Sequence, residues 1–516
     1  MSAHVLAVDL GSTGIKVAVV DELGAVRSIV GEVIPLLFVA DGGVEQDPRV
    51  WWEALGRCAR RAIAESGLPG SGVTLVAVTS QYTSTTAVDA AGRPMGNTVM
   101  WMDGRGRRHF RPHWSDAQRE TWVDVHGLMP HGNDDVGHVH VIRDQWPDAY
   151  DAAAAFVEPM DLLAARLTGR VTATQNTMFP MVSVDNRTWG LTEYSDELLA
   201  MTGMPVDKLP PLVSLGEPRG TVTAEAAEHL GVSARAVVTG ATIDSVTSAV
   251  GTGAIDADTC GLIIGTTAVM ATHLPSKRHD IEHGLTAAPS PLPQSWFLVA
   301  ENGVGGKALD VFVNNMVYPA DGLGVPVHGG SYDAVLAAAA QVPCGSNGVL
   351  FLPWLVGSMA PGHERNMRGG FVNIGLATTR ADMARAVLEG VAMNVAWLLP
   401  YFSALAGHQY SQITFGGGGA ASSLWGQILA DATGVPVRRL ARSTCTNAHG
   451  AALLALYEAG RYALSDLPGL LVTEQVHEPH AEHRELLAAR TASLIDFHAR
   501  NAPFYDGFDS KEPHHD

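Results

Sequence analysis

A glycine-rich hairpin opens the chain, and it constrains the fold more than any other feature because a similar pattern returns about 250 residues later. Residues 5–9 are apolar and end in an aspartate, residues 10–14 carry glycine and hydroxyl side chains, and residues 15–20 are apolar again. A second turn signal follows at residues 21–24. The pattern predicts a β-meander of three strands.

The later copy has an apolar strand pattern at residues 260–264, a Gly-Thr-Thr turn and a returning apolar stretch at residues 268–272. Two interpretations are open: a duplicated domain with a cleft between the copies, or a chance match of three turn residues. A boundary near residues 253–258 fits the first. The polar end, residues 509–516, is expected to be frayed. The expected units are residues 1–253, residues 254–460, and a helical extension with a polar tail over residues 461–516.

Both halves mix helix and strand signals. Asp47 and Pro48 suit the N-cap and first position of a helix, and residues 75–79 suit a buried strand. In the second half an apolar strand at residues 413–415 leads into four glycines, residues 416–419. The sequence therefore predicts an α/β protein throughout. Further helices are expected over residues 381–397, 420–431 and 450–459.

Charge and composition exclude several classes of protein. Lys and Arg number 34 against 53 Asp and Glu, and this net charge of −19 argues against nucleic acid or an anionic membrane as the main partner. No signal peptide or membrane helix is expected, because the start lacks basic residues and the longest apolar run, residues 33–40, is short and contains Pro35. Four scattered cysteines without a CxxC pair predict reduced thiols and a cytoplasmic location.

The opening turn has the residue types of an anion site. Its glycines let backbone N–H groups approach a phosphate, Ser12 and Thr13 add hydroxyl donors, and Asp9 can hold a metal ion that neutralises phosphate oxygens. An ordinary hairpin with a capping aspartate remains the alternative. The chain has no GxxxxGK[ST] sequence and no GxGxxG between a strand and a helix, which excludes a P-loop and a Rossmann fingerprint.

Two further positions allow both a functional and a structural interpretation. Asp244 follows an apolar strand in a loop of small residues, where it can accept a proton from an attacking hydroxyl or cap a helix that begins near Val246. Gly417 and Gly418 can lie against a nucleotide or form a plain strand-to-helix turn. The residues alone leave these alternatives open.

Taken together, the motifs resemble the FGGY carbohydrate kinases of the actin/hexokinase-like superfamily, with xylulokinase-type members closest. The resemblance runs from residue 5 to about residue 460 and follows the family's motif order. It implies an α/β fold of two ribonuclease-H-like domains that face each other across a cleft. The matching segments are residues 9–16, 45–52, 101–105, 158–169, 240–244, 265–267, 384–391 and 416–420.

The resemblance also implies an activity and its residues. The enzyme would transfer the γ-phosphoryl group of MgATP to a hydroxyl of a small sugar or polyol, with Asp244 as general base and Asp9 positioning Mg²⁺. Residues implied to contact the phosphates or the nucleotide are Gly11, Ser12, Thr13, Lys16, Gly265, Thr266, Thr267, Gly417, Gly418, Ser422 and Asn447. Residues implied to line the sugar pocket are Gln81, Tyr82, Trp101 and Asp103.

The sequence constrains the identity of the substrate less than it constrains the type of reaction. A ketopentose such as xylulose leads, but after Gln81 the chain has Tyr82, Thr83 and Ser84 where xylulokinases usually have Met-His-Gly, so an imidazole is missing beside the substrate. A tetritol or pentitol kinase, a non-catalytic sugar sensor and an ATPase of the same superfamily are the alternatives. Retention of Asp9 and Asp244 argues against the sensor. Family habit suggests a homodimer.

Two histidine groups also call for an interpretation. Residues 126–140 contain four histidines together with Asp134 and Asp135, but their spacing fits no standard zinc pattern and shows no clear period. We expect a loop near the sugar-binding face. His480 and His483 fall in a polar helical stretch and are expected to be solvated.

Overall fold

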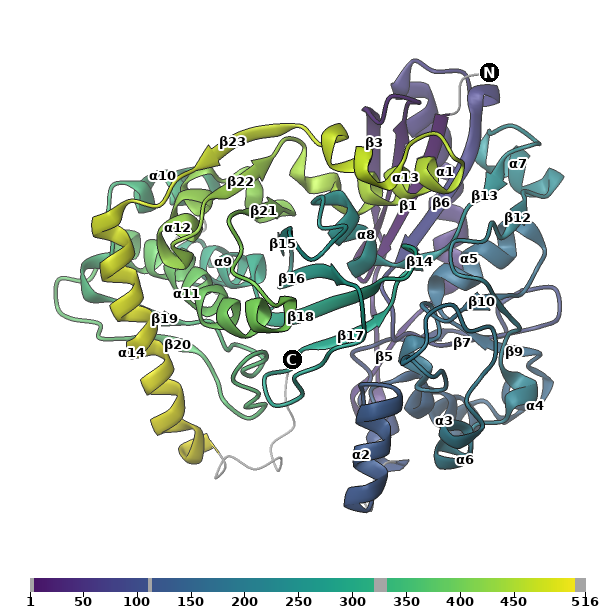
Figure 1. Ribbon diagram of the computed structural model, residues 1–516, viewed down its shortest axis with the longest axis horizontal. Helices are drawn as coiled ribbons and strands as arrows, with labels where there is room; N and C mark the ends of the chain where they lie inside the picture. Colours follow the sequence, from purple (N-terminus) through teal and green to yellow (C-terminus); the bar gives the residue numbers. More distant parts are fainter. Residues whose placement is uncertain (1–3, 110–113, 320–331, 506–516) are drawn as a thin grey trace.

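The computed structural model describes residues 4–109, 114–319 and 332–505. The end predicted to be frayed, residues 509–516, lies outside them. Two α/β halves lie side by side, the N-terminal half in purple to teal and the C-terminal half mainly in green and yellow (Figure 1). The four cysteines are free, as expected.

The first half is built on a seven-stranded sheet with strand order β12-β13-β6-β1-β2-β3, to which β14 adds beside β6. β1, β2 and β3 are antiparallel, which confirms the predicted meander, and β6 runs parallel to β1. Asp47 caps α1, accepting from the N–H of Arg49, and α1 packs on β2 and β3. The strands are β1 (His4–Gly11), β2 (Gly14–Val20), β3 (Val26–Val33), β6 (Val73–Ser80), β12 (Gly220–Thr221), β13 (Val237–Val238) and β14 (Thr242–Ile243).

Smaller elements surround this sheet, and one of them corrects an expectation. The segment expected to be a loop, residues 126–140, is helical from Asp135 onward, because Asp134 caps α3 by accepting from the N–H of Gly137. The helices are α1 (Pro48–Ser66), α2 (Asp116–Val125), α3 (Asp135–Gln145), α4 (Pro147–Ala152), α5 (Pro159–Thr168), α6 (Asp196–Thr202), α7 (Ala224–Leu230) and α8 (Asp244–Gly251). The remaining strands are β4 (Leu37–Val39), β5 (Gly43–Gln46), β7 (Thr86–Val88), β8 (Thr98–Val99), β9 (Ala155–Val157), β10 (Ala173–Thr174) and β11 (Leu212–Val213).

The second half repeats the topology of the first. Its sheet has the order β17-β18-β16-β15-β21-β22-β23, in which β18, β16 and β15 are antiparallel neighbours and β21 and β22 continue parallel to β15. Three antiparallel strands followed by two parallel ones also make up β3-β2-β1-β6-β13, so the sequence echo reflects duplicated architecture. The strands are β15 (Cys260–Ile264), β16 (Thr267–Leu274), β17 (Thr286–Pro289), β18 (Trp296–Val304), β21 (Ile413–Gly416), β22 (Val437–Leu440) and β23 (Thr473–His477), with a separate pair β19 (Leu350–Leu352) and β20 (Gly370–Val372).

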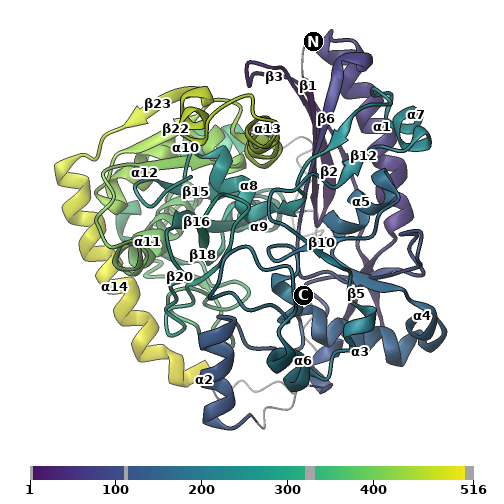
Figure 2. The ribbon, with the colours of Figure 1, turned by 45° about the vertical axis from the view of Figure 1, so that its right-hand side comes forward.

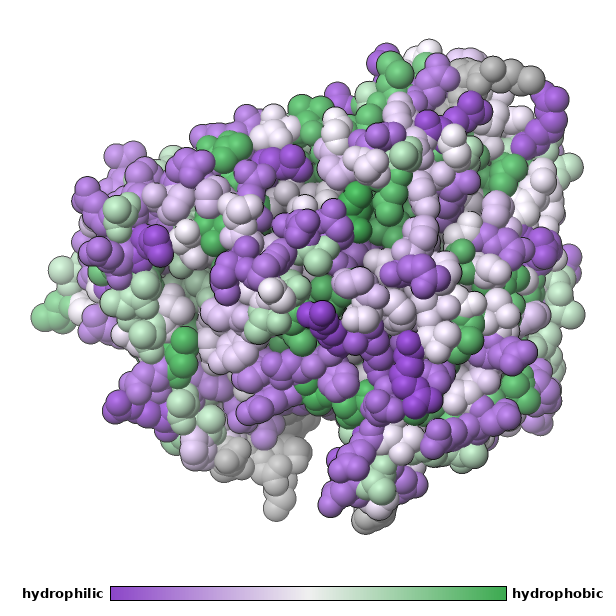
Figure 3. Space-filling view, viewed as in Figure 1, coloured by the Kyte–Doolittle hydropathy of each residue, from purple (hydrophilic) through white to green (hydrophobic). Residues whose placement is uncertain are grey.

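Helices cover the second sheet and extend across to the first. α11 is the one helix in the described ranges that is long and apolar enough to cross a membrane, and it is mostly buried in the core of the second half. Figure 3 shows hydrophilic side chains over much of one face, with hydrophobic ones scattered among them. The helices are α9 (Gly306–Phe312), α10 (Tyr332–Ala340), α11 (Arg380–Ala406), α12 (Ser423–Thr433), α13 (Thr446–Glu458) and α14 (Ala481–Tyr505).

Three C-terminal elements connect distant parts of the chain. α13 packs against α8 and against β1 and β6, so a helix late in the sequence covers the first sheet. After it, β23 pairs with β22 and α14 packs on α11 and α12, along the outer edge of the second half (Figure 2). The packing of α13 brings residues near position 447 to the strand ends of the first half.

Candidate active site

Asp9 and Asp244 emerge at the same edge of the first sheet. In the parallel pairing of β1 with β6, Asp9 lies opposite Thr79, and in the pairing of β14 with β6, Thr242 lies opposite the same Thr79. Asp244 comes two residues later, at the first position of α8. Because these three strands are parallel, their carboxyl ends meet, and the two carboxylates are brought to one place.

The negative charge of Asp9 affects the pKa of Asp244. Burial raises the pKa of Asp244 to about 7, and the neighbouring charges of Asp9 and Glu301 add to the rise, while hydrogen bonds from Ser245 oppose it. Burial also raises the pKa of Asp9, against the opposing effects of Lys16 and a hydrogen bond from Asn447. Asp244 therefore titrates near neutral pH, as a general acid or base does. The helix-capping alternative is wrong, because Ile243 occupies the N-cap of α8.

The first hairpin contacts residues of both halves of the chain at the expected site. The indole Nε1 of Trp101 donates to the Ser12 hydroxyl at 2.9 Å, and the Gln46 amide donates to the Ser12 carbonyl at 2.8 Å. Thr13 is exposed at the tip. The Lys16 ammonium donates to the carbonyl of Thr444 at 3.2 Å and so reaches the short 3₁₀ helix that precedes α13.

The glycine turns of the second half lie next to each other. β15 and β21 are parallel neighbours, and their register places Gly265 and Gly417 just beyond adjacent strand ends. Gly417 has φ +83°, and a Cβ there would lie 2.6 Å from the carbonyl oxygen of Ile264, so the position requires glycine. Added Cβ atoms at Gly265 and Gly418 would meet no atom within 4 Å. Both turns thus present backbone to open space.

The other nucleotide candidates have contacts of their own. Thr266 is exposed, Thr267 begins β16, and the Thr266 carbonyl accepts from backbone N–H groups at the start of α9. Ser422 caps α12 by accepting from the N–H of Trp425 at 3.2 Å. Asn447 accepts from the hydroxyl of Ser248 at 2.6 Å and lies beside Asp9.

Thr446 connects Asn447, the next residue along α13, to the glycine turn at Gly417, because the Thr446 Oγ1 accepts from the N–H of Gly417 at 3.3 Å. The first turn of α13 therefore spans the distance between the second-half glycines and Asp9. The structure places Asn447 at the acidic end of that span.

The four residues expected to line the sugar pocket differ in burial and in whether their polar groups already have partners within the protein. Gln81 is buried and its Oε1 has no hydrogen-bond partner, which leaves an acceptor for a ligand hydroxyl. Tyr82 lies beside Asp244 and Glu301, since their charges add to the effect of burial in raising its pKa. Trp101 is 36% exposed.

Asp103, by contrast, is fully buried and already engaged. Its carboxylate pairs with Arg105 at 2.7 Å and accepts from the N–H of Val44 at 2.9 Å. Arg105 also pairs with Glu45 at 2.8 Å. These contacts make Asp103 a support for the loop that carries Trp101.

Two glutamates near the site were missed at the level of sequence. Glu301, in β18, reaches solvent, yet protein surrounds it closely enough that desolvation raises the pKa of its carboxyl. Glu158 is buried and accepts from the backbone N–H groups of Thr83 at 2.9 Å and Ser84 at 3.3 Å. A charged residue within the apolar stretch of β18 was the available signal for Glu301.

The residues present suit a magnesium ion. Mg²⁺ prefers hard oxygen ligands and commonly uses one or two carboxylates together with substrate phosphates. The negative charges of Asp9 and Asp244 repel each other, and the charge of Asp9 contributes to the high pKa of Asp244. A divalent cation between the strand edge and a phosphate would relieve that repulsion.

The duplicated α/β halves, with acids on one and open glycine turns on the other, have the two-domain kinase fold of the actin/hexokinase-like class. Residues 4–251 match the N-terminal domain of the FGGY family of carbohydrate kinases, and residues 260–459 match its C-terminal domain. The chain belongs to this family and is a carbohydrate kinase.

Relatives at similar distance act on different substrates. A xylulose kinase of Staphylococcus epidermidis is 26% identical over 489 residues, covering 93% of this chain and 94% of its own. A glycerol kinase of Methylibium petroleiphilum is 29% identical over 487 residues, covering 90% and 92%. The solved gluconate kinase of Lactobacillus acidophilus superposes with a TM-score of 0.86 at 20% identity, covering 99% of this chain and 100% of that one. Overall similarity therefore fixes the fold and the kinase family but leaves the acceptor open.

Proposed function

We propose that this chain transfers the γ-phosphoryl group of MgATP to a hydroxyl of a small sugar or polyol, with Asp244 as general base. The observation that carries the proposal is the placement of Asp244 beside Asp9 at one sheet edge, with a pKa of about 7. A base with a pKa near the working pH accepts protons most effectively in the transition state.

In this mechanism the acceptor hydroxyl oxygen forms a bond to the γ-phosphorus while the bond from that phosphorus to the bridging oxygen of ADP breaks. The hydroxyl proton passes to Asp244. Asp9 would hold Mg²⁺, which neutralises phosphate charge when bound. Backbone N–H groups at the turns around Gly11 and Gly265 would face phosphate oxygens, and Gly417 and Gly418 would border the nucleoside.

For the acceptor we propose a ketopentose such as xylulose, in line with the xylulose kinase among the relatives. The free Oε1 of Gln81 and the phenol of Tyr82 suit a polyhydroxylated substrate. The missing imidazole after Gln81 supports a second candidate, a tetritol or pentitol, because a changed hydrogen-bonding group in a pocket can shift substrate preference. A cytoplasmic location remains an inference from the scattered cysteines, and a homodimer remains an inference from the resemblance.

The substitution Asp244→Asn tests the central role. We expect sugar-dependent ADP release to fall by about 10²–10⁴-fold, the usual contribution of a general base, while nucleotide binding and thermal unfolding stay close to the parent. Asp258→Asn is the matched control, because the Asp258 side chain is 91% exposed and makes only a 3.9 Å approach to His408. Parent-level turnover of Asp244→Asn would remove Asp244 from the role of base.

A further inference from the structure

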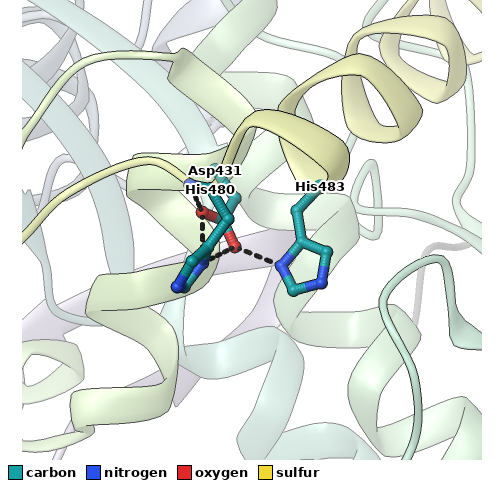
Figure 4. A group of neighbouring side chains, drawn as sticks. All are labelled: Asp431, His480 and His483. Carbon is teal, nitrogen blue, oxygen red and sulfur yellow. Dashed lines mark hydrogen bonds and ion pairs between the residues drawn. The ribbon is translucent and has the colours of Figure 1, made fainter.

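A second cluster of chemistry-bearing side chains lies away from the candidate active site, where α14 begins against α12 (Figure 4). Nδ1 of His480 lies 3.2 Å from one carboxylate oxygen of Asp431, and Nδ1 of His483 lies 2.9 Å from the other. Both histidines are solvent-exposed, as expected, but each also contacts the buried carboxylate of Asp431. Their partner is about 50 residues earlier in the chain, so the sequence pattern alone gave no sign of it.

Surrounding contacts hold the carboxylate in a fixed orientation. Asp431 is 2% exposed, and its Oδ1 accepts from the amide of Gln427 at 2.9 Å and from the backbone N–H of His480 at 2.8 Å. The same Gln427 amide donates to the carbonyl of Glu478 at 2.8 Å, which fixes the chain just before α14. Such outer contacts orient the ligands of metal sites.

The cluster offers the donor set that zinc prefers. One atom from each of Asp431, His480 and His483 lies within 4.8 Å of the others. Two imidazole nitrogens and a carboxylate oxygen, with water in the fourth position, form a usual tetrahedral zinc site, whereas Mg²⁺ and Ca²⁺ select oxygen ligands. The histidine side chains are 56% and 39% exposed, so an ion can reach them from solvent.

We propose that Asp431, His480 and His483 bind a divalent transition-metal ion, with zinc favoured by the ligand chemistry. In the ion's absence the same atoms form histidine–carboxylate hydrogen bonds. Coordination would replace these bonds with shorter ones, each imidazole offering the Nδ1 lone pair and carrying its proton on Nε2.

The site would be separate from phosphoryl transfer. Ser422 caps one end of α12 and Asp431 lies nine positions further along, which is about 13 Å of helix rise. An ion there would join α12 to the first turn of α14. Metal binding is therefore expected to stabilise the second half without being required for turnover.

The test is a zinc titration of untagged, chelator-treated protein without nucleotide, followed by calorimetry and by the visible absorption of Co²⁺ as a substitute. We expect one tight Zn²⁺ per chain, a higher unfolding temperature with Zn²⁺ but not with Mg²⁺, and a tetrahedral Co²⁺ spectrum. The double variant His480→Gln/His483→Gln should bind Zn²⁺ at this site more than about 100-fold more weakly, and Gln427→Ala about 10–100-fold more weakly.

His408→Gln is the control and should leave binding unchanged, because His408 lies outside the cluster. The double variant keeps every other histidine, including His514 and His515, so a difference from the parent belongs to the cluster. Absence of tight Zn²⁺ binding by the parent, or equal binding by the double variant, would overturn the proposal.

Discussion

At the scale of single residues, a buried carboxyl holds the turn that follows Tyr82. Thr83 adopts a left-handed conformation with φ +60°, which is unfavourable for a β-branched residue. Glu158 accepts from the N–H groups of Thr83 and Ser84 and so holds this turn. Because Tyr82 precedes the turn, Glu158 acts as a positioning residue for the sugar side of the site.

Glu158→Gln tests this role. A glutamine has one acceptor oxygen, so its amide nitrogen would face one of the two backbone donors, and a lost buried hydrogen bond costs about 1–3 kcal/mol. We expect the KM for the sugar to rise about tenfold, with kcat and the KM for ATP little changed. Glu193→Gln, at an exposed glutamate, is the control. Equal changes in both KM values would contradict a role specific to the sugar.

The pKa of Asp244 also predicts a pH dependence. A base must be unprotonated to accept a proton, so kcat/KM should fall as the pH drops through about 7, whereas an ordinary aspartate would stay active well below that pH. Glu301→Gln removes a negative charge that helps to raise the pKa of Asp244, so the midpoint should move to lower pH. Glu485→Gln, on the exposed side of α14, should leave the profile unchanged. A profile flat from pH 5 to 8 would show that Asp244 does not titrate as described.

Sequence reasoning was strongest for residues with a local pattern. The strand-to-turn patterns around Asp9 and Gly417 made both residues candidates, and the backbone conformation of Gly417 explains why glycine occupies that position. Glu158 and the Asp431 cluster were missed because their partners are distant in the chain. Asp103 is expected at the sugar from the sequence, and only its contacts with Arg105 and the N–H of Val44 indicate that it supports a loop.

At the scale of elements, α8 and α13 pack backbone to backbone beside the site. A Cβ at Gly450 would lie 1.9 Å from the carbonyl oxygen of Thr247, and one at Gly251 would lie 2.2 Å from that of Thr446. α8 begins with Asp244 and α13 carries Asn447, so the close approach positions both. The sequence predicted a helix at this place in the second half, but its docking on the first sheet needed the tertiary structure.

Gly450→Ala should force these helices apart. We expect the free energy of unfolding to fall by about 1–3 kcal/mol, as for other overpacked cores, and kcat to fall because Asp244 and Asn447 shift. Gly469→Ala is the control, since a Cβ there meets no atom within 4 Å. Urea unfolding and steady-state kinetics on both variants measure the effects. Parent-like stability of Gly450→Ala would mean that the helices can separate without cost.

At the scale of the whole molecule, two sheets of the same topology each carry candidate site residues at their strand ends. The first supplies Asp9 and Asp244, the second supplies the turns at Gly265 and Gly417, and α13 spans them. The repeated hairpin suggested this duplication as one of two interpretations, and the matching strand orders of the two sheets favour it. The relative placement of the halves could not be predicted from the sequence, because it depends on contacts such as that of Lys16 with Thr444.

The most direct test of the account is ADP release from MgATP by the parent enzyme across a panel of ketopentoses, tetritols and pentitols, with the product identified by mass spectrometry. We predict that at least one acceptor raises ADP release well above the sugar-free rate and yields its phosphate ester in equal amount. ADP release that is the same with every acceptor and without any, and no phosphorylated product, would contradict direct transfer to a sugar hydroxyl.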